Sequence, residues 1–262
     1  MNGPENSSDQ LDRFSNRAEY YARSRPGYPV AVITLLQKEA VWRPDSVIAD
    51  IGAGTGISSE LFLRHGNCVF AVEPNADMRA SAESLRVRYP LFRLMEGTAE
   101  DTGLTARSVD IVTAATAFHW FDPAKTRLEF ARILKPSGHV VLLWNERHSE
   151  ASPFLQAYEE ILQRFGTDYK QRWGSERKSV GTKVDEFFQG PFETRRFNNP
   201  QHLDFDGLHA RVLSASYAPL PGQPNYAEMM TAMREIFDRE QHDGKVTFEY
   251  ETIVYFGQLS RD

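Results

Sequence analysis

One glycine-rich turn constrains the fold of this chain more than any other stretch. Residues 47–51 have the apolar composition of a short buried strand, and residues 58–63 show the pattern of a helix. The turn between them contains Gly52, Gly54 and Gly56. Glycine lets the backbone bend sharply and lets a ligand approach it closely. The first amides of the following helix lie at the positive end of its dipole and point at that ligand. The stretch therefore predicts an α/β fold with a ligand site where the first strand ends.

Two classes of binding turn have this general form. The dinucleotide fingerprint G-x-G-x-x-G would require glycine at position 57, where the chain has Ile57. The chain instead reads D-x-G-x-G-x-G from Asp50 to Gly56. We expect Asp50, at the end of the strand, to hold the turn by accepting backbone N–H bonds. A Rossmann-like loop that binds another ligand, or none, is the alternative at this point.

An acidic residue follows the turn at an informative distance. Residues 68–73 read as the second strand, and Glu73 ends it about 20 residues after the turn, the spacing at which an acid meets a ribose. A carboxylate there can accept hydrogen bonds from both ribose hydroxyls and would repel a 2′-phosphate. Pro74 and Asn75 are expected to open the next helix, and Met78, one turn in, is placed to lie against an adenine ring.

The whole pattern resembles the class I S-adenosylmethionine (SAM) dependent methyltransferases. It is most similar to the small-molecule group of methyltransferase type 11 and trans-aconitate methyltransferase-like proteins. The stretches that carry the resemblance are residues 14–29, 50–56, 73–78, 117–122 and 251–259. The resemblance implies a Rossmann-like, seven-stranded, mostly parallel sheet whose last strand is antiparallel and inserted between the fifth and sixth. It also implies SAM as cofactor and S-adenosylhomocysteine (SAH) as product.

The same resemblance implies one methyltransferase domain over residues 1–262, with residues 13–41 and 200–243 forming a helical cap over the acceptor. Other elements are expected from local patterns. These are helices at 30–41, 123–134, 153–165, 205–217 and 225–240; strands at 92–97, 139–147, 192–197 and 246–259; a strand that runs into a loop at 108–122; a turn at 135–138; and a loop or lid with Trp173 at 167–190.

Several side chains are assigned to the cofactor through the resemblance. Arg25, in an aromatic N-terminal stretch with Tyr20, is a candidate partner for the SAM carboxylate. The family often has aspartate where this chain has Thr98, so the adenine N6 contact falls to Glu100 or to the Thr98 hydroxyl. The full expected set is Tyr20, Arg25, Asp50, Gly52, Ala53, Gly54, Glu73, Pro74, Met78, Thr98, Ala99, Glu100, Ala115 and Phe118.

The acceptor side is less constrained. Small residues such as Ala115 end the fourth strand and leave room for a ligand, and residues 118–121 then crowd the place where an acceptor would meet the methyl group. His119 is the candidate general base, because a histidine pKa can lie near neutral. Tyr217 and His209 are candidates for orienting the acceptor. A carboxylate acceptor would need no base, and the reaction needs neither a covalent intermediate nor a metal.

Composition sets the remaining expectations. The chain has 262 residues, a net charge of −6 and one cysteine, Cys68. The net negative charge argues against a duplex nucleic-acid partner, and a single cysteine fits a reducing cytosol. Neither a secretory signal nor an apolar run of about 18 residues is seen. We expect a cytoplasmic monomer or homodimer that acts on a small molecule and not at a membrane. An NAD(P)-binding oxidoreductase and a SAM-binding protein without turnover are the competing hypotheses.

Overall fold

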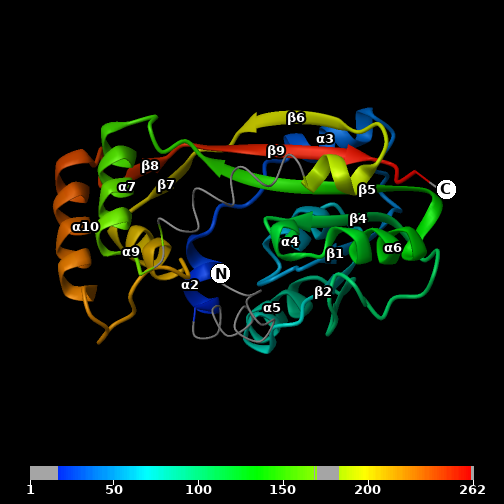
Figure 1. Ribbon diagram of the computed structural model, residues 1–262, viewed down its shortest axis with the longest axis horizontal. Helices are drawn as coiled ribbons and strands as arrows, with labels where there is room; N and C mark the ends of the chain where they lie inside the picture. The colour runs from blue at the N-terminus through cyan, green and yellow to red at the C-terminus, as the bar shows by residue number, and fades with distance from the viewer. Residues whose placement is uncertain (1–16, 168, 170–182, 261–262) are drawn as a thin grey trace, which may run out of the picture. The chain divides into compact units, whose positions relative to one another are not determined.

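The computed structural model describes residues 17–167, 169 and 183–260 (Figure 1). The chain divides into two compact units. The sheet unit comprises Gly27–Asn145, Lys178–Phe197 and Thr252–Asp262, and the helical unit comprises Met1–Pro26, Glu146–Arg177 and Asn198–Glu251. Residues 13–16 of the expected N-terminal helix and Trp173 of the expected lid lie outside the described residues.

The sheet unit is built on seven strands in the order β3-β2-β1-β4-β5-β9-β6. The strands β1, β2, β3, β4 and β5 are joined by parallel pairings, and parallel sheets are normally covered on both faces. Figure 1 shows β9 running opposite to its neighbours β5 and β6. The predicted topology, with an antiparallel last strand between the fifth and sixth, is confirmed. The strand bounds are β1 Val47–Ile51, β2 Cys68–Val72, β3 Phe92–Met95, β4 Val109–Ala115, β5 Leu134–Arg147, β6 Glu193–Asn198 and β9 Tyr250–Gly257.

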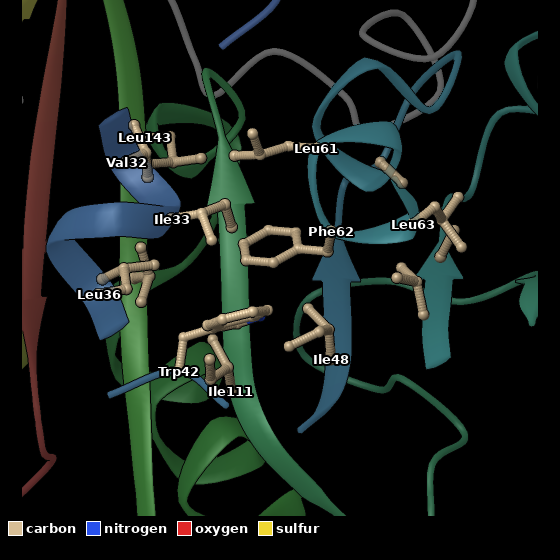
Figure 2. Packing of buried hydrophobic residues seen from close by; sticks show 14 of the residues in the cluster. Val32, Ile33, Leu36, Trp42, Ile48, Leu61, Phe62, Leu63, Ile111 and Leu143 are labelled. Carbon is tan, nitrogen blue, oxygen red and sulfur yellow. The ribbon is translucent and has the colours of Figure 1, made fainter. Parts of the chain in front are cut away.

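Helices cover both faces of this sheet. On one face α3 (Ala31–Lys38), α4 (Ile57–Leu63) and α5 (Ala76–Arg88) share a buried cluster with Ile48 of β1. The next residue, Ala49, belongs to the cluster on the other face, where α6 (Pro123–Ile133) packs. Figure 2 shows Val32, Ile33 and Leu36 on the side of α3 that faces the strands. Burying side chains of this size contributes about 1.5–3 kcal/mol each, so the packing fixes the strand ends on which the site depends.

The helical unit has a core of its own. Helix α2 packs against α9, and α7 packs against α10. The short strands β7 and β8 pair antiparallel, with Leu203 opposite Val246. Buried Arg17 donates hydrogen bonds to the carbonyls of Leu213, Ala215 and Ala218 at 2.7, 2.7 and 2.8 Å, which caps the end of α9. The bounds are α2 Ala18–Ser24, α7 Pro153–Phe165, α9 Phe205–Leu213, α10 Tyr226–Glu240, β7 Gln201–Leu203 and β8 Val246–Phe248.

The observed elements differ from the expected ones in several places, and residues 183–188 of the expected loop are helical. The strand expected at 246–259 is two strands, because β8 pairs with β7 while β9 joins the large sheet. The turn expected at 135–138 is an irregularity within β5, where Val109 pairs with Leu134 but Ile111 pairs with His139. Helix α3 packs in the core of the sheet unit and α7 in that of the helical unit, and the extent of the acceptor cap stays a prediction.

Within residues 17–167, 169 and 183–260, none of the helices is long and apolar enough to cross a bilayer.

Candidate functional site

The glycine turn between β1 and α4 has the backbone geometry that its sequence predicts. Gly52, Gly54 and Gly56 have φ of 67, 56 and 85°, all in the left-handed region. A Cβ on Gly56 would lie 2.4 Å from a methyl carbon of Leu85, so this glycine lets α4 pack on α5. A Cβ on Gly54 would meet nothing within 4 Å. Gly54 is therefore the point of the turn that is open to a ligand.

Glu73 binds this turn directly. Its Oε2 accepts the backbone N–H of Gly54 at 2.8 Å, and its Oε1 accepts the N–H of Asn75 at 2.9 Å. The residue is 7% exposed, and burial raises the pKa of its carboxyl group despite these bonds. A carboxylate has about four acceptor positions, so two remain for further donors. The acid and the glycine turn are therefore neighbours in the fold, and the ribose contact of Glu73 stays a prediction.

Asp50 holds the turn through more partners than expected. Its Oδ2 accepts the hydroxyls of Ser58 and Ser59 at 2.7 and 2.6 Å, in addition to the Ser59 backbone. Its Oδ1 is buried without a hydrogen-bond partner among the described residues. Burial raises the pKa of Asp50 to about 6. The serines were missed in the sequence, although two adjacent hydroxyls at the start of α4 were a usable signal.

The start of α5 agrees with the sequence. Asn75 is the N-cap of the helix and accepts the N–H of Met78 at 2.9 Å. The Met78 side chain is buried, at 4% exposure. Pro74 stands between Glu73 and this cap, and its carbonyl accepts Arg79 at 2.8 Å. Contact of Met78 with adenine stays a prediction.

The segment after β3 has internal partners for both predicted N6 acceptors. The Thr98 hydroxyl accepts the N–H of Asp101 at 3.2 Å, and Ala99 beside it is buried. Glu100 Oε1 accepts the N–H of Asp122, the N-cap of α6, at 3.0 Å. Glu100 thus connects this loop to the start of α6, a link that the sequence did not reveal.

The end of β4 lies against the glycine turn. A Cβ on Gly52 would come within 2.8 Å of the Ala117 Cβ and 3.3 Å of the Phe121 ring. Phe118 is 1% exposed and packs on Phe187 with ring centroids 4.9 Å apart, which makes its side chain part of the core. Ala115, the last residue of β4, is half-buried.

Thr116 marks the turn out of β4. It has a φ of 53°, an uncommon conformation for a threonine. Its hydroxyl shares a hydrogen bond of 3.1 Å with Tyr28. Backbone strain of this kind clusters at functional sites, and the sequence gave no signal for it.

His119 lies in the short helix η1 (Phe118–Trp120) among aromatic side chains. Its ring centroid is 4.5 Å from that of Trp120 and 5.1 Å from that of Trp144. Its Nδ1 has no partner among the described residues, and Lys183 donates to its carbonyl at 3.1 Å. Burial, and then the charge of Lys183, lower the pKa of His119 to about 3. A pKa this low makes the imidazole neutral and weakly basic, which counts against His119 as the general base.

Four predicted residues belong to the helical unit. Arg25 donates to Ser214 Oγ and to the Ser214 carbonyl at 3.1 and 3.2 Å, and the Tyr20 carbonyl accepts Ser24. Tyr217 packs on Tyr169, and His209 bonds the Tyr226 hydroxyl. The roles of Tyr20 and Arg25 at the cofactor, and of Tyr217 and His209 at the acceptor, stay predictions.

The carboxyl ends of β1, β2 and β4 thus bring together the open Gly54, the carboxylate of Glu73 and the small residue Ala117. Comparison with known proteins shows which family this part of the chain matches. Residues 49–142 match the family model described as "Methyltransferase domain", methyltransferase type 11. These residues form a methyltransferase type 11 domain. Over these residues the chain is similar to the class I SAM-dependent methyltransferases.

Relatives of this methyltransferase domain occur in bacteria and yeast. An uncharacterized methyltransferase of Mycobacterium tuberculosis is 36% identical over 159 residues, which are 61% of this chain and 62% of the relative. The match therefore spans about three fifths of that curated relative. An uncharacterized methyltransferase of Schizosaccharomyces pombe is 26% identical over 244 residues, 90% of this chain and 92% of the relative.

Solved structures show the same fold beyond the methyltransferase domain. A candidate methyltransferase from an antibiotic biosynthesis pathway of Anabaena variabilis is 22% identical with a TM-score of 0.61, covering 90% of this chain and 99% of that one. A candidate type II methyltransferase of Anaeromyxobacter dehalogenans is 21% identical with a TM-score of 0.56, covering 90% and 98%.

Proposed function

We propose that this protein transfers the methyl group of SAM to a small-molecule acceptor and releases SAH. The observation that carries the proposal is the hydrogen bond between Gly54 and Glu73, because it places an acid beside the one open glycine of the turn. The methyltransferase type 11 domain over residues 49–142 supports the choice of SAM over other nucleotides.

The donor set at the turn fits SAM. The free acceptor positions of Glu73 suit the two ribose hydroxyls, and Gly54 allows the ligand to approach the backbone. The unpartnered Oδ1 of Asp50 is an acceptor of the kind that an ammonium group uses. Met78, Thr98 and Glu100 are the proposed adenine neighbours.

Positioning does most of the chemistry in this proposal. SAM would supply a methyl group on a sulfonium: the acceptor would form a bond to the methyl carbon as the bond from that carbon to sulfur breaks, and SAH would leave. Holding two reactants in line can lower the barrier by ~7–11 kcal/mol. The aromatic residues of η1 exclude water near the turn. Because the pKa of His119 is about 3, we assign its ring to shaping the acceptor side and not to removing a proton. An acceptor that is already ionised, such as a carboxylate, fits a site without a base.

Ligand-induced thermal shifts test the proposal. SAM and SAH should raise the melting temperature of the full chain, and NAD should leave it unchanged, because only a ligand that binds the folded state stabilises it. A screen of small carboxylic acids, phenols and amines should then release SAH from SAM with at least one acceptor. Stabilisation by NAD alone would favour the oxidoreductase. Binding of SAM with no turnover across the screen and a cell extract would favour the non-catalytic protein.

A further inference from the structure

Two arginines of the helical unit, the buried Arg211 and the half-buried Arg25, have no carboxylate partner among the residues that the structure describes, whereas the buried Arg147 has one. Arg147 pairs with Glu159, Nη2 to Oε2, at 2.6 Å. Arg211 is 4% exposed, and its described contacts are two hydroxyl groups and the ring of Phe248. Arg25 donates to Ser214 and lies over the ring of Tyr21. Buried charges are normally paired, so the helical unit carries an excess of buried positive charge.

Arg25 and Arg211 converge on the same hydroxyl. Ser214 Oγ accepts Arg25 Nε at 3.1 Å and Arg211 Nη1 at 3.5 Å, and itself donates to the Arg211 carbonyl at 2.7 Å. Two like charges at one neutral group repel each other. Burial, and then the charge of Arg211, lower the pKa of Arg25 accordingly. An anion at this position would relieve the repulsion.

Two tyrosines complete the group. Arg211 Nε donates to the Tyr250 hydroxyl at 3.0 Å. The ring of Tyr158 and the guanidinium of Arg211 both contact Phe248, at 5.0 and 5.8 Å. The Tyr158 hydroxyl is fully buried and has no hydrogen-bond partner among the described residues. Burial would raise the pKa of Tyr250, but Arg211, Arg147 and Arg25 outweigh it and the pKa lies below its ordinary value.

The helical unit also shows what a purely structural arginine looks like. Arg17 is equally buried, but three backbone carbonyls accept its hydrogen bonds. The helical unit also shows how an arginine and a tyrosine together bind a carboxylate. Glu159 accepts Arg147 on one oxygen and the Tyr169 hydroxyl on the other, at 2.6 and 2.5 Å. Arg211 and the Tyr158 hydroxyl are donors of the same two kinds, both lie against Phe248, and neither has a side-chain carboxylate partner among the described residues.

We propose that the arginine–tyrosine cluster, defined as Arg25, Arg147, Arg211, Tyr158, Tyr250 and Ser214, binds the carboxylate of a small organic acid. Arg211 supplies the charge, and the Tyr158 hydroxyl donates a second hydrogen bond. That this acid is the methyl acceptor rests on the proposed function, whereas carboxylate binding by the cluster does not. Because Arg25 is also a candidate partner of SAM, the test uses Arg211 and Tyr158.

The test compares carboxylates with neutral amides of the same shape. Benzoate and succinate, titrated into the full chain at constant ionic strength, should raise its melting temperature, and benzamide and succinamide should not. Calorimetry should give a carboxylate Kd about tenfold weaker or more for Tyr158→Phe, since a hydrogen bond to a charged group is lost. Without ligand, Tyr158→Phe should be as stable as the natural protein, because it removes a hydroxyl that has no partner. Arg211→Met should abolish carboxylate binding.

Matched controls make the result decisive. Tyr226→Phe removes a hydroxyl of the same unit that bonds His209, and Arg234→Met removes an exposed arginine on α10. Both should bind carboxylates normally. Equal responses to carboxylates and amides, or an unchanged Kd in Tyr158→Phe, would overturn the proposal even if Arg211→Met fails to fold. The SAM-induced thermal shift, measured on the same variants, should persist in Tyr158→Phe. If SAM gave no thermal shift in the natural protein, that result would count against the proposed function and not against carboxylate binding by the cluster.

Discussion

The backbone N–H of Gly54 and the Oε2 of Glu73 are 2.8 Å apart, which joins the turn after β1 to the end of β2. This one bond orients the carboxylate beside the open glycine and leaves the rest of its acceptor positions free. The ribose part of the proposed cofactor site is therefore built before any ligand arrives. Preorganisation of this kind lowers the cost of binding.

The glycines of the turn should respond differently to alanine. In Gly54→Ala the left-handed φ should cost about 1–2 kcal/mol of folding free energy, and the new methyl should project to the ligand side and weaken SAM binding. In Gly56→Ala the methyl would also overlap Leu85, so stability should fall further, by roughly 1–3 kcal/mol more. Urea unfolding and SAM calorimetry measure the two effects.

Gly66→Ala is the matched control for these variants. Gly66 has a φ of 84° and open space around its missing Cβ, as Gly54 has, but lies after α4 and away from the turn. It should lose a similar amount of stability and bind SAM normally. Equal SAM affinity in Gly54→Ala and Gly66→Ala would mean that the ligand does not lie against Gly54.

Asp50 should make the folded protein more stable as the pH falls toward 4. Its pKa is about 6 in the fold against an ordinary value of 3.8, so between these values the folded state binds a proton that the unfolded chain does not. The ionised carboxylate opposes folding above pH 6 by roughly 3 kcal/mol. In Asp50→Asn this dependence should disappear. The free energy of unfolding of the natural protein relative to Asp50→Asn should therefore rise as the pH drops from 7 to 4.5.

The exposed residue Asp45 provides the comparison for Asp50. Its side chain is 81% exposed, and it pairs with Arg43 at the surface. The difference in stability between the natural protein and Asp45→Asn should be small, because an exposed ion pair contributes about 0–1 kcal/mol. A pH-independent difference for Asp50→Asn would show that the buried carboxyl group does not titrate near 6.

His119 should not titrate in the physiological range. Its pKa is about 3 in the fold against 6.5, so the unfolded chain takes up the proton first and the contribution of His119 to stability decreases as the pH falls below 6.5. The ring resonances of His119 in an NMR titration, assigned by comparison with His119→Asn, should stay constant from pH 5 to 9. A midpoint near 6.5 would restore His119 as a candidate base.

The sequence was sufficient for the fold of the sheet unit because its signals are local. The glycines at 52, 54 and 56 mark one strand–turn–helix, and Asn75 and Asp122 cap the helices that they precede. The pairing of the strands was harder to predict from the sequence. Residues 246–259 alternate throughout, but alternation does not reveal that β8 pairs with β7 and β9 with β5 and β6.

The candidate site could be predicted only in part, because many of its contacts join residues that are distant in the sequence. Glu73 follows from a fixed spacing along the chain, whereas the bond from Glu100 to Asp122 joins residues 22 positions apart. The pKa of His119 depends on Trp120, Trp144 and Lys183 together, and two of these are distant in sequence. The arginines at 25, 147 and 211 come from three segments, so their excess of charge becomes visible only in the fold.

Calorimetric titration of SAM into the full chain and into Glu73→Gln tests the central claim most directly. The natural protein should bind one SAM per chain, and Glu73→Gln should bind it at least about tenfold more weakly, because hydrogen bonds to a charged group contribute roughly 1.5–3 kcal/mol each. Glu83→Gln, on the exposed side of α5, should bind SAM as the natural protein does. SAM affinity that is absent from the natural protein, or identical in Glu73→Gln, would contradict the account.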